Sequence, residues 1–130
     1  MGSLQTGEIV GRYRVEERIG EGGLATVYRV KHVELGSQHA LKVLLHRHPA
    51  LTRRMRTEGQ IQASLEHPAI VRVTDMLEVD GYGALIMEYI DGETLAGLIA
   101  RVGPMTVDDA LTLMSPIFSA IAAAHGAGVV

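Results

Sequence analysis

The feature that most constrains the fold is a run of glycines between two short segments of strand-like sequence. Gly20, Gly22 and Gly23 interrupt the chain after residues 13–19, where apolar and charged side chains alternate as in a half-buried strand. Residues 25–33 are rich in β-branched side chains, which favours a second strand. The sequence therefore predicts a strand, a glycine turn and a second strand, in that order.

Patterns further along the chain predict three more strands and a helix. Residues 39–45, 71–79 and 84–90 are short apolar segments of strand type, and an Asp-Gly turn joins the last two. Residues 49–67 have helical spacing, and a His-Pro step ends this helix. The expected inward face of the helix consists of Leu51, Met55, Glu58, Gln62 and Leu65.

Helical sequence continues to the end of the chain. Residues 94–101 form a short amphipathic segment, and residues 106–124 form a longer helix that begins at Thr106. Pro116 predicts a kink or break within the longer helix. Because this helix is apolar on most sides, we expect a second lobe or a partner to cover it.

Composition limits the classes of function. The chain has 130 residues, 47% of them hydrophobic, a formal charge of −3 and no cysteine. These values exclude a disulfide framework and a thiolate zinc site, and they give no electrostatic footprint for nucleic acid. No uninterrupted apolar run reaches the roughly 18 residues of a membrane helix, so we expect a cytoplasmic domain without a membrane segment. His46 and His48 lack a nearby cysteine or carboxylate, so no metal site is expected.

The glycine turn has two interpretations when it is taken alone. It can be a flexible hairpin, or it can fold over a polyphosphate and offer backbone N–H groups without side-chain obstruction. A dinucleotide-binding turn leads into a helix, whereas a strand follows here. The sequence also lacks the Gly-Lys-Ser/Thr of a P-loop, so both of these phosphate sites are excluded.

Lys42 and Glu58 are charged residues in mostly apolar segments. Lys42 lies within the strand of residues 39–45 and needs a partner or an anionic ligand, unless it extends to solvent. Glu58 follows on the next helix, where it can neutralise Lys42 or pair with Arg54 one turn earlier. The residues alone leave both alternatives open.

In combination, these features resemble the protein kinase family. Residues 19–28, Ile-Gly-Glu-Gly-Gly-Leu-Ala-Thr-Val-Tyr, look like the glycine-rich loop, followed by a strand lysine at Lys42 and a helix glutamate at Glu58. Residues 65–71 resemble the segment after that helix, and residues 85–95 resemble the hinge between the two kinase lobes. The resemblance covers nearly the whole chain and is strongest to bacterial eukaryotic-like serine/threonine kinases.

The resemblance implies a role for each matched residue. The loop would cover the ATP phosphates, Lys42 would contact the α- and β-phosphates, and Glu58 would hold Lys42 in place, so these two form the expected catalytic set. Met87 would be the gatekeeper behind the adenine, and the backbones of Glu88 and Ile90 would bind the adenine edge. The expected nucleotide-binding set is Ile19, Gly20, Glu21, Gly22, Gly23, Leu24, Ala25, Thr26, Val27, Ala40, Lys42, Met87, Glu88 and Ile90.

Two residues depart from the family pattern. Ala25 stands at the third glycine of the loop, which is a small change. Gln62 stands where the family usually has an apolar residue in the stack that links the lobes. This glutamine either loosens the active arrangement or forms a local hydrogen bond.

The resemblance also predicts the fold and its divisions. The expected class is α+β, with a five-stranded antiparallel sheet and one helix, followed by the first helices of a helical second lobe. Residues 1–10 would be an N-terminal segment, residues 11–90 the first lobe, and residues 91–130 the hinge exit and the start of the second lobe.

The implied activity is transfer of the ATP γ-phosphate to serine and threonine hydroxyls of substrate proteins. The His-Arg-Asp and Asp-Phe-Gly motifs that orient the nucleophile and hold Mg²⁺ are absent from the 130 residues, and the catalytic loop would follow Val130. We therefore expect ATP binding, Mg²⁺ binding only with the second lobe, and no activity of the chain alone. A membrane tether would lie beyond residue 130. The alternative is a non-catalytic nucleotide-binding or protein-interaction module.

Overall fold

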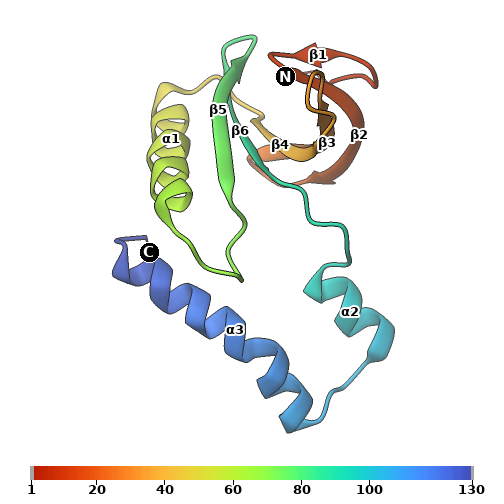
Figure 1. Cartoon of the computed structure of the whole chain (residues 1–130), viewed down its shortest axis with the longest axis vertical. Coiled ribbons are helices and arrows are strands. Elements are labelled where there is room, and N and C mark those ends of the chain that lie inside the picture. Colours follow the sequence, from red (N-terminus) through yellow and green to blue (C-terminus); the bar gives the residue numbers. More distant parts are fainter. Residues whose placement is uncertain (1, 130) are drawn as a thin grey trace.

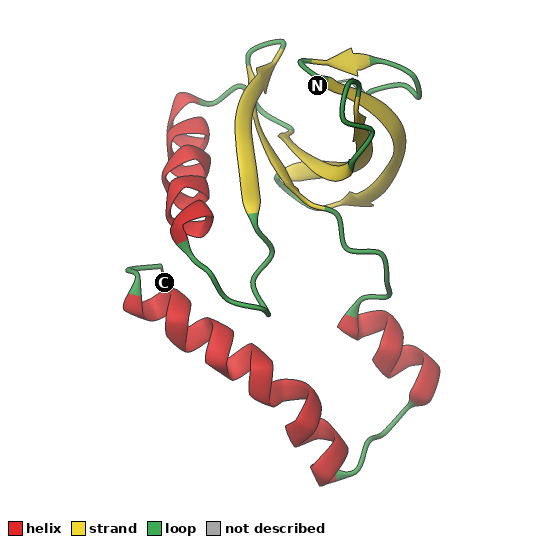
Figure 2. Ribbon diagram, in the orientation of Figure 1, coloured by secondary structure: helices red, strands yellow, loops and turns green. Residues whose placement is uncertain are grey.

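The computed structural model describes residues 2–129, so residues 1 and 130 lie outside the description. Six strands form one curled antiparallel sheet in the order β1-β2-β3-β4-β6-β5 (Figures 1 and 2). The strands are β1 (Ile9–Val10), β2 (Tyr13–Glu21), β3 (Ala25–His32), β4 (Gln38–Leu44), β5 (Val73–Val79) and β6 (Tyr82–Glu88). The helices are α1 (Pro49–Ser64), α2 (Leu95–Val102) and α3 (Val107–Gly126).

The sheet has one strand more than the five expected. Ile9 pairs with Arg14 and Val10 pairs with Tyr13, so residues 9–10 extend the sheet at its edge. Two residues are too short to show a periodicity, and this is why the strand could not be recognised in the sequence. The N-terminal segment is therefore part of the sheet, and Leu4 is buried in the same core.

The inside of the curl holds the main hydrophobic core. The residues with the least exposed side chains are Leu41, Ile86, Val15 and Val30, which come from β4, β6, β2 and β3. The phenol oxygen of Tyr28 accepts a hydrogen bond from the Leu4 N–H at 3.1 Å, which fixes the N-terminal segment against this core. A second, smaller cluster packs α1 against the outer side of the sheet through Leu44, Met55, Val73 and Leu85.

Local signals place the turns and helix starts as expected. Asp80 and Gly81 both have positive φ, 51° and 83°, which confirms the tight turn between β5 and β6. The hydroxyls of Thr94 and Thr106 accept hydrogen bonds from the backbone at the starts of α2 and α3. Helix α1 ends at Ser64, earlier than expected, because the chain leaves the helical region before Pro68.

Helix α3 continues through Pro116, so the predicted break is wrong. Proline removes one backbone hydrogen bond, and the turns on either side keep theirs. The helix extends away from the sheet with much of its apolar surface exposed, including Leu111 and Phe118. By length and composition alone, α3 could cross a bilayer, although core helices of larger domains pass the same test.

Candidate functional site

The register of the strands gathers the predicted pocket residues on the outer face of the sheet. Val27 lies opposite Lys42, and Ala40 lies opposite Met87. Residues directly opposite each other, and residues two apart on one strand, share a face. We call the face that carries Val27, Ala40, Lys42 and Met87 the Lys42 face. Helix α1 packs on the same face, nearer to β5 (Figure 1).

The glycine-rich loop joins β2 to β3 at one edge of the Lys42 face. The Gly22 N–H donates to the Ala25 carbonyl at 2.8 Å, and the Leu45 N–H donates to the Leu24 carbonyl at 2.9 Å. None of Gly20, Gly22 and Gly23 has a positive φ. A Cβ atom would meet nothing closer than 3.8 Å at Gly20 and Gly22, and it would meet nothing within 4 Å at Gly23.

A cavity of about 230 Å³ lies between the Lys42 face, the glycine loop and α1. Its apolar lining comes from Leu24, Ala25, Leu44, Leu51, Met55, Leu85 and Met87, and its polar lining from Lys42, Arg54, Glu58 and Gln62. Leu24, Ala25, Lys42, Glu58 and Met87 are thus five predicted site residues that the fold brings to one cavity.

The predicted inward position of Glu58 is wrong in this structure, and so is its pairing with Lys42. The Glu58 side chain is 55% exposed, and its Oε1 lies 2.9 Å from the Nε of Arg54. This hydrogen bond raises the pKa of Arg54 above its usual value. Among residues 2–129, no carboxylate lies within ion-pair distance of Lys42.

The orientation of α1 explains this pairing. Met55 and Gly59 face the sheet and are buried, so Glu58, one residue before Gly59, lies at the edge of the packed face. The four-residue spacing to Arg54 allows a local pair that orders little additional chain. Lys42 and Glu58 consequently line one cavity without touching.

Gln62 forms the local hydrogen bond that was one of its two alternatives. Its Nε2 donates to the Val71 carbonyl at 2.6 Å. This bond ties the end of α1 to the chain just before β5. The amide group of Gln62, which stands in the expected stack between the lobes, therefore has a backbone hydrogen-bond partner within the first lobe.

The segment after β6 offers a free backbone donor. The Glu88 N–H donates to the Arg72 carbonyl at 2.9 Å. In the part of the chain that the structure describes, the Ile90 N–H has no hydrogen-bond partner, and its side chain is exposed. An unpaired N–H beside an apolar slot suits recognition of a planar heterocycle edge.

Two residues of the expected set point elsewhere. Thr26 is buried and lies on the other face of β3, as its neighbour Tyr28 does. Glu21 is exposed at the loop and pairs with Arg18 at 3.4 Å. Alternation along the strand predicts both positions, because every second side chain leaves the Lys42 face.

Gly59 and Arg29 lie at the site but were not among the predicted site residues. Gly59 carries a signal, because a glycine inside a helix costs stability and usually has a packing reason. A Cβ at this position would lie 2.9 Å from Leu85 Cδ2. Arg29 carries no local signal, because only the register places it opposite Ala40.

No group of three or more His, Asp or Glu side chains within residues 2–129 is arranged to hold a metal ion. His46 and His48, the pair considered from the sequence, lie in the segment between β4 and α1 and are exposed. The Nδ1 of His48 accepts a hydrogen bond from the Ala50 N–H at 3.2 Å, so this ring caps the start of α1.

The curled sheet, the single helix on its outer face and the glycine loop over a lysine together define the N-terminal lobe of a protein kinase, followed by helices of a second lobe. The protein kinase domain matches residues 13–130, and the chain belongs to the protein kinase family. The expected fold class is thereby confirmed, and α3 lies within the matched domain.

Similar sequences and solved structures come from bacterial protein kinases. The chain is 40% identical over 120 residues to the serine/threonine-protein kinase PrkC of Bacillus subtilis, and 36% identical over 123 residues to the serine/threonine-protein kinase pkn2 of Myxococcus xanthus. The PknI kinase domain of Mycobacterium tuberculosis matches with a TM-score of 0.82 at 30% identity.

These matches cover most of this chain and a smaller part of the other proteins. They include 90% of this chain and 18% of PrkC, and 92% of this chain and 15% of pkn2. For PknI the shares are 98% of this chain and 53% of the solved domain. The chain thus spans less than a fifth of these two relatives and about half of the solved kinase domain.

Proposed function

We propose that these residues form the ATP-binding half of a serine/threonine protein kinase, which transfers the ATP γ-phosphate to hydroxyl groups of substrate proteins. The observation that most supports this proposal is the composition of the glycine loop. Its three glycines are required neither by a positive φ nor by packing within the chain. Close approach of a ligand to the backbone is a physical reason for omitting these side chains, and a polyphosphate fits such a loop.

Lys42 supplies a positive charge that would attract the phosphates. It lines a cavity whose walls are mostly apolar and, among the described residues, it has no carboxylate within ion-pair distance. An uncompensated cation in such surroundings favours binding of an anion. The α- and β-phosphates of ATP would lie between Lys42 and the loop, with the adenine between Val27, Ala40 and Met87.

The proposed active arrangement requires a movement of α1. Lys42 and Glu58 line the same cavity, whereas Glu58 pairs with Arg54 in the structure. Phosphoryl transfer in this family depends on the lysine–glutamate pair. We infer that rotation of α1 toward the sheet exchanges the Arg54 partner of Glu58 for Lys42.

The second half of a kinase domain would complete the chemistry. Mg²⁺ bridges the ATP phosphates in this family, and its ligands come from motifs that the 130 residues do not contain. We therefore propose that residues 11–90 bind the nucleotide, that residues 91–130 connect to the catalytic half, and that these residues alone do not transfer phosphate. The proposed location is the cytoplasm, where ATP and substrate proteins are available.

A thermal-shift measurement on Lys42→Met tests the nucleotide site. Mg·ATP at about 100 times its Kd should raise the Tm of the parent chain by roughly 5–10 °C. The same concentration should leave the Tm of the variant unchanged, because the phosphates lose their cation. The matched control is Lys31→Met, which removes the chain's other lysine from an exposed position on β3.

The thermal-shift measurement can contradict the assigned nucleotide site in two ways. If Mg·ATP does not shift the parent, or shifts Lys42→Met as much as the parent, the assigned site is wrong. A binding partner that associates equally with both chains would then favour the alternative, a protein-interaction module. A response of Lys31→Met that matches the parent would confirm that the loss is specific to the Lys42 position.

A further inference from the structure

Strand β2 contains a bulge a few residues before the glycine loop. Its register against β3 shifts between Val15 and Glu17, so Glu16 lies outside the regular ladder. In a regular strand Glu16 and Glu17 would point to opposite faces. A bulge turns two consecutive side chains toward one partner residue, and it also bends the strand.

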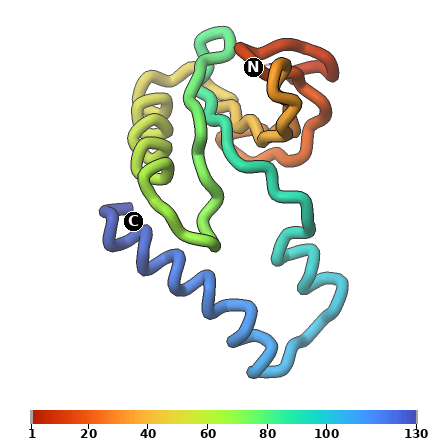
Figure 3. The backbone as a smooth tube through the Cα atoms, viewed as in Figure 1, coloured from red at the N-terminus to blue at the C-terminus, as the bar shows by residue number. Residues whose placement is uncertain are grey.

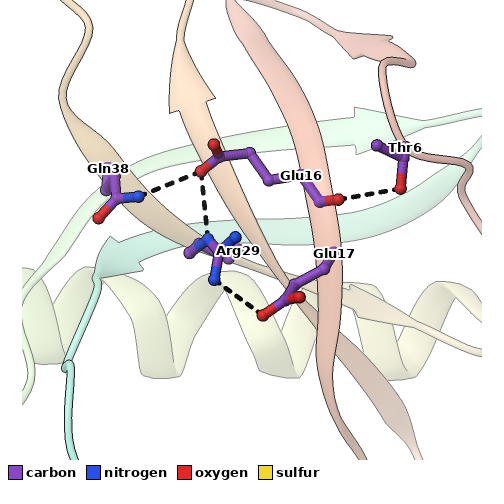
Figure 4. A network of polar contacts seen from close by, with 5 residues as sticks. All are labelled: Thr6, Glu16, Glu17, Arg29 and Gln38. Atoms are coloured by element: carbon purple, nitrogen blue, oxygen red, sulfur yellow. Dashed lines mark hydrogen bonds and ion pairs between the residues drawn. The ribbon is translucent and has the colours of Figure 1, made fainter.

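That partner is Arg29 on β3, the ladder partner of Glu17 (Figure 4). Its Nε donates to Glu16 Oε1 at 3.2 Å, and its Nη1 donates to Glu17 Oε1 at 2.8 Å. Gln38 of β4 donates to the same Glu16 oxygen at 3.3 Å, and the Thr6 hydroxyl donates to the Glu16 carbonyl at 2.9 Å. Arg29 therefore joins β2 to β3, and Glu16 adds contacts to β4 and to the N-terminal segment.

This network lies at one end of the Lys42 face. Arg29 is opposite Ala40 in the register and two residues after Val27 on the same strand. Gln38 lies on the strand that carries Ala40 and Lys42, so its contact with Glu16 links the bulge to that strand. Arg29 thus holds the bulged strand of the glycine-loop hairpin, and through Glu16 it connects this hairpin to β4.

The Arg29–Glu16 pair is also the most enclosed ion pair of residues 2–129. Its two side chains are 26% and 28% exposed, whereas those of Arg18 and Glu21 are 53% and 56% exposed. Partly enclosed charges are screened less by water and salt than exposed ones. The restraint that Arg29 imposes should therefore persist at physiological ionic strength.

We propose that Arg29 is a positioning residue of the nucleotide site: it holds both carboxylates of the β2 bulge, one of which also accepts a hydrogen bond from Gln38 of β4, and it thereby fixes the glycine-loop hairpin relative to the strand that carries Lys42. This inference rests on the proposed function. ATP binds between these two parts, so a hairpin held in place loses less conformational freedom when the nucleotide binds. Loss of the restraint weakens ATP binding without removing any group that touches ATP.

The test compares Arg29→Ala, Glu17→Gln and the double variant with the parent chain. Amide hydrogen exchange of residues 16–27 is measured without nucleotide, and the Kd for Mg·ATP is measured by calorimetry. Arg29→Ala should speed exchange in this hairpin and raise Kd roughly threefold. Arg101→Ala is the control, because it breaks the exposed pair with Glu93 far from the hairpin.

A double-mutant cycle separates positioning from general destabilisation. If Arg29 acts through Glu17, the double variant should bind ATP no more weakly than Arg29→Ala does. Additive effects of the two changes would overturn the proposal, and so would unchanged hairpin exchange in Arg29→Ala. Glu17→Gln is a conservative change at an exposed site, so it tests the same contact if Arg29→Ala does not fold.

The two readouts distinguish this proposal from the function on which it rests. A parent chain that does not bind Mg·ATP contradicts the proposed function and, with it, the effect of Arg29 on affinity. Exchange is measured without nucleotide and decides the restraint separately. Faster exchange in Arg29→Ala supports the restraint, and exchange equal to that of the parent overturns it whatever the result for ATP.

Discussion

Tyr13, at the start of β2, contacts two histidine rings at the far end of the sheet from the glycine loop. Its ring meets His32 edge-on at 5.3 Å and His39 at 5.5 Å, and its hydroxyl donates to Asp75 at 3.4 Å. Burial, followed by the charge of Asp75, raises the pKa of Tyr13. Burial, followed by the charge of His32, lowers the pKa of His39 below its usual value of 6.5.

The lowered pKa of His39 predicts a loss of stability in mild acid. The folded chain favours the neutral ring, so the unfolded chain binds more protons once the pH falls below about 6.5. The free energy of unfolding should be insensitive to His39 above that pH and should decrease from there down to the folded-state pKa. Urea unfolding between pH 8 and pH 5 measures this slope.

His39→Gln should reduce the slope, because it removes the proton-binding group, and His46→Gln is the exposed control. Equal slopes in the parent and in His39→Gln would show that other groups cause any acid sensitivity.

At the scale of elements, the decisive packing is α1 against the Lys42 face. The helix contacts β5 and β6 through Met55 and Gly59, and the absence of a side chain at Gly59 lets it approach Leu85. This approach fixes the rotation of α1 about its own axis. The rotation in turn decides how close Glu58 comes to Lys42, whereas Arg54 stays one turn away on the same helix.

Gly59→Val tests this close approach. The added side chain would overlap Leu85 and force α1 outward, so we expect the free energy of unfolding to fall by about 1–3 kcal/mol. Gly126→Val is the matched control, because a Cβ at this α3 position meets nothing within 4 Å. Gly126 is the last residue of α3, so the control shows the effect of the same replacement at a helix position without close packing. Chemical denaturation measures the difference, and equal losses would contradict the packing argument.

At the scale of the whole molecule, the two parts meet at two places along the chain. The segment after β6 leads into α2, and the C-terminal end of α3 returns to lie below α1 (Figure 3). There the Nε2 of His67 and the Oγ of Ser119 are 2.9 Å apart, which joins the loop after α1 to α3. This contact is the second place where the two parts meet.

Ser119→Ala should release α3 from the first lobe. Loss of one hydrogen bond is worth about 1 kcal/mol, so opening of this contact should become roughly fivefold more favourable. Limited proteolysis of the segment between β6 and α2 should speed up accordingly. Ser115→Ala, an exposed change on the same helix, is the control. Equal cleavage rates of the two variants would show that the contact does not hold the parts together.

Local patterns were sufficient for most elements. Alternation, β-branched side chains and short apolar runs placed β2 to β6 within a few residues, and Thr94 and Thr106 marked the starts of two helices. These signals are readable because a strand period, an N-cap or a tight turn depends on residues close in sequence. The glycine loop and Lys42 were recognised in the same way, by spacing and resemblance.

The order and type of the elements, and the residues that could form the site, could therefore be predicted from local sequence. How these parts meet could not be predicted: residues 9–10 join the sheet, Glu58 pairs with Arg54, and Arg29 holds a bulge. These outcomes depend on register and on the rotation of α1, which are set by packing between segments far apart in the chain. A local pattern cannot report them, because the competing partners differ little in energy until the whole sheet and helix are in place.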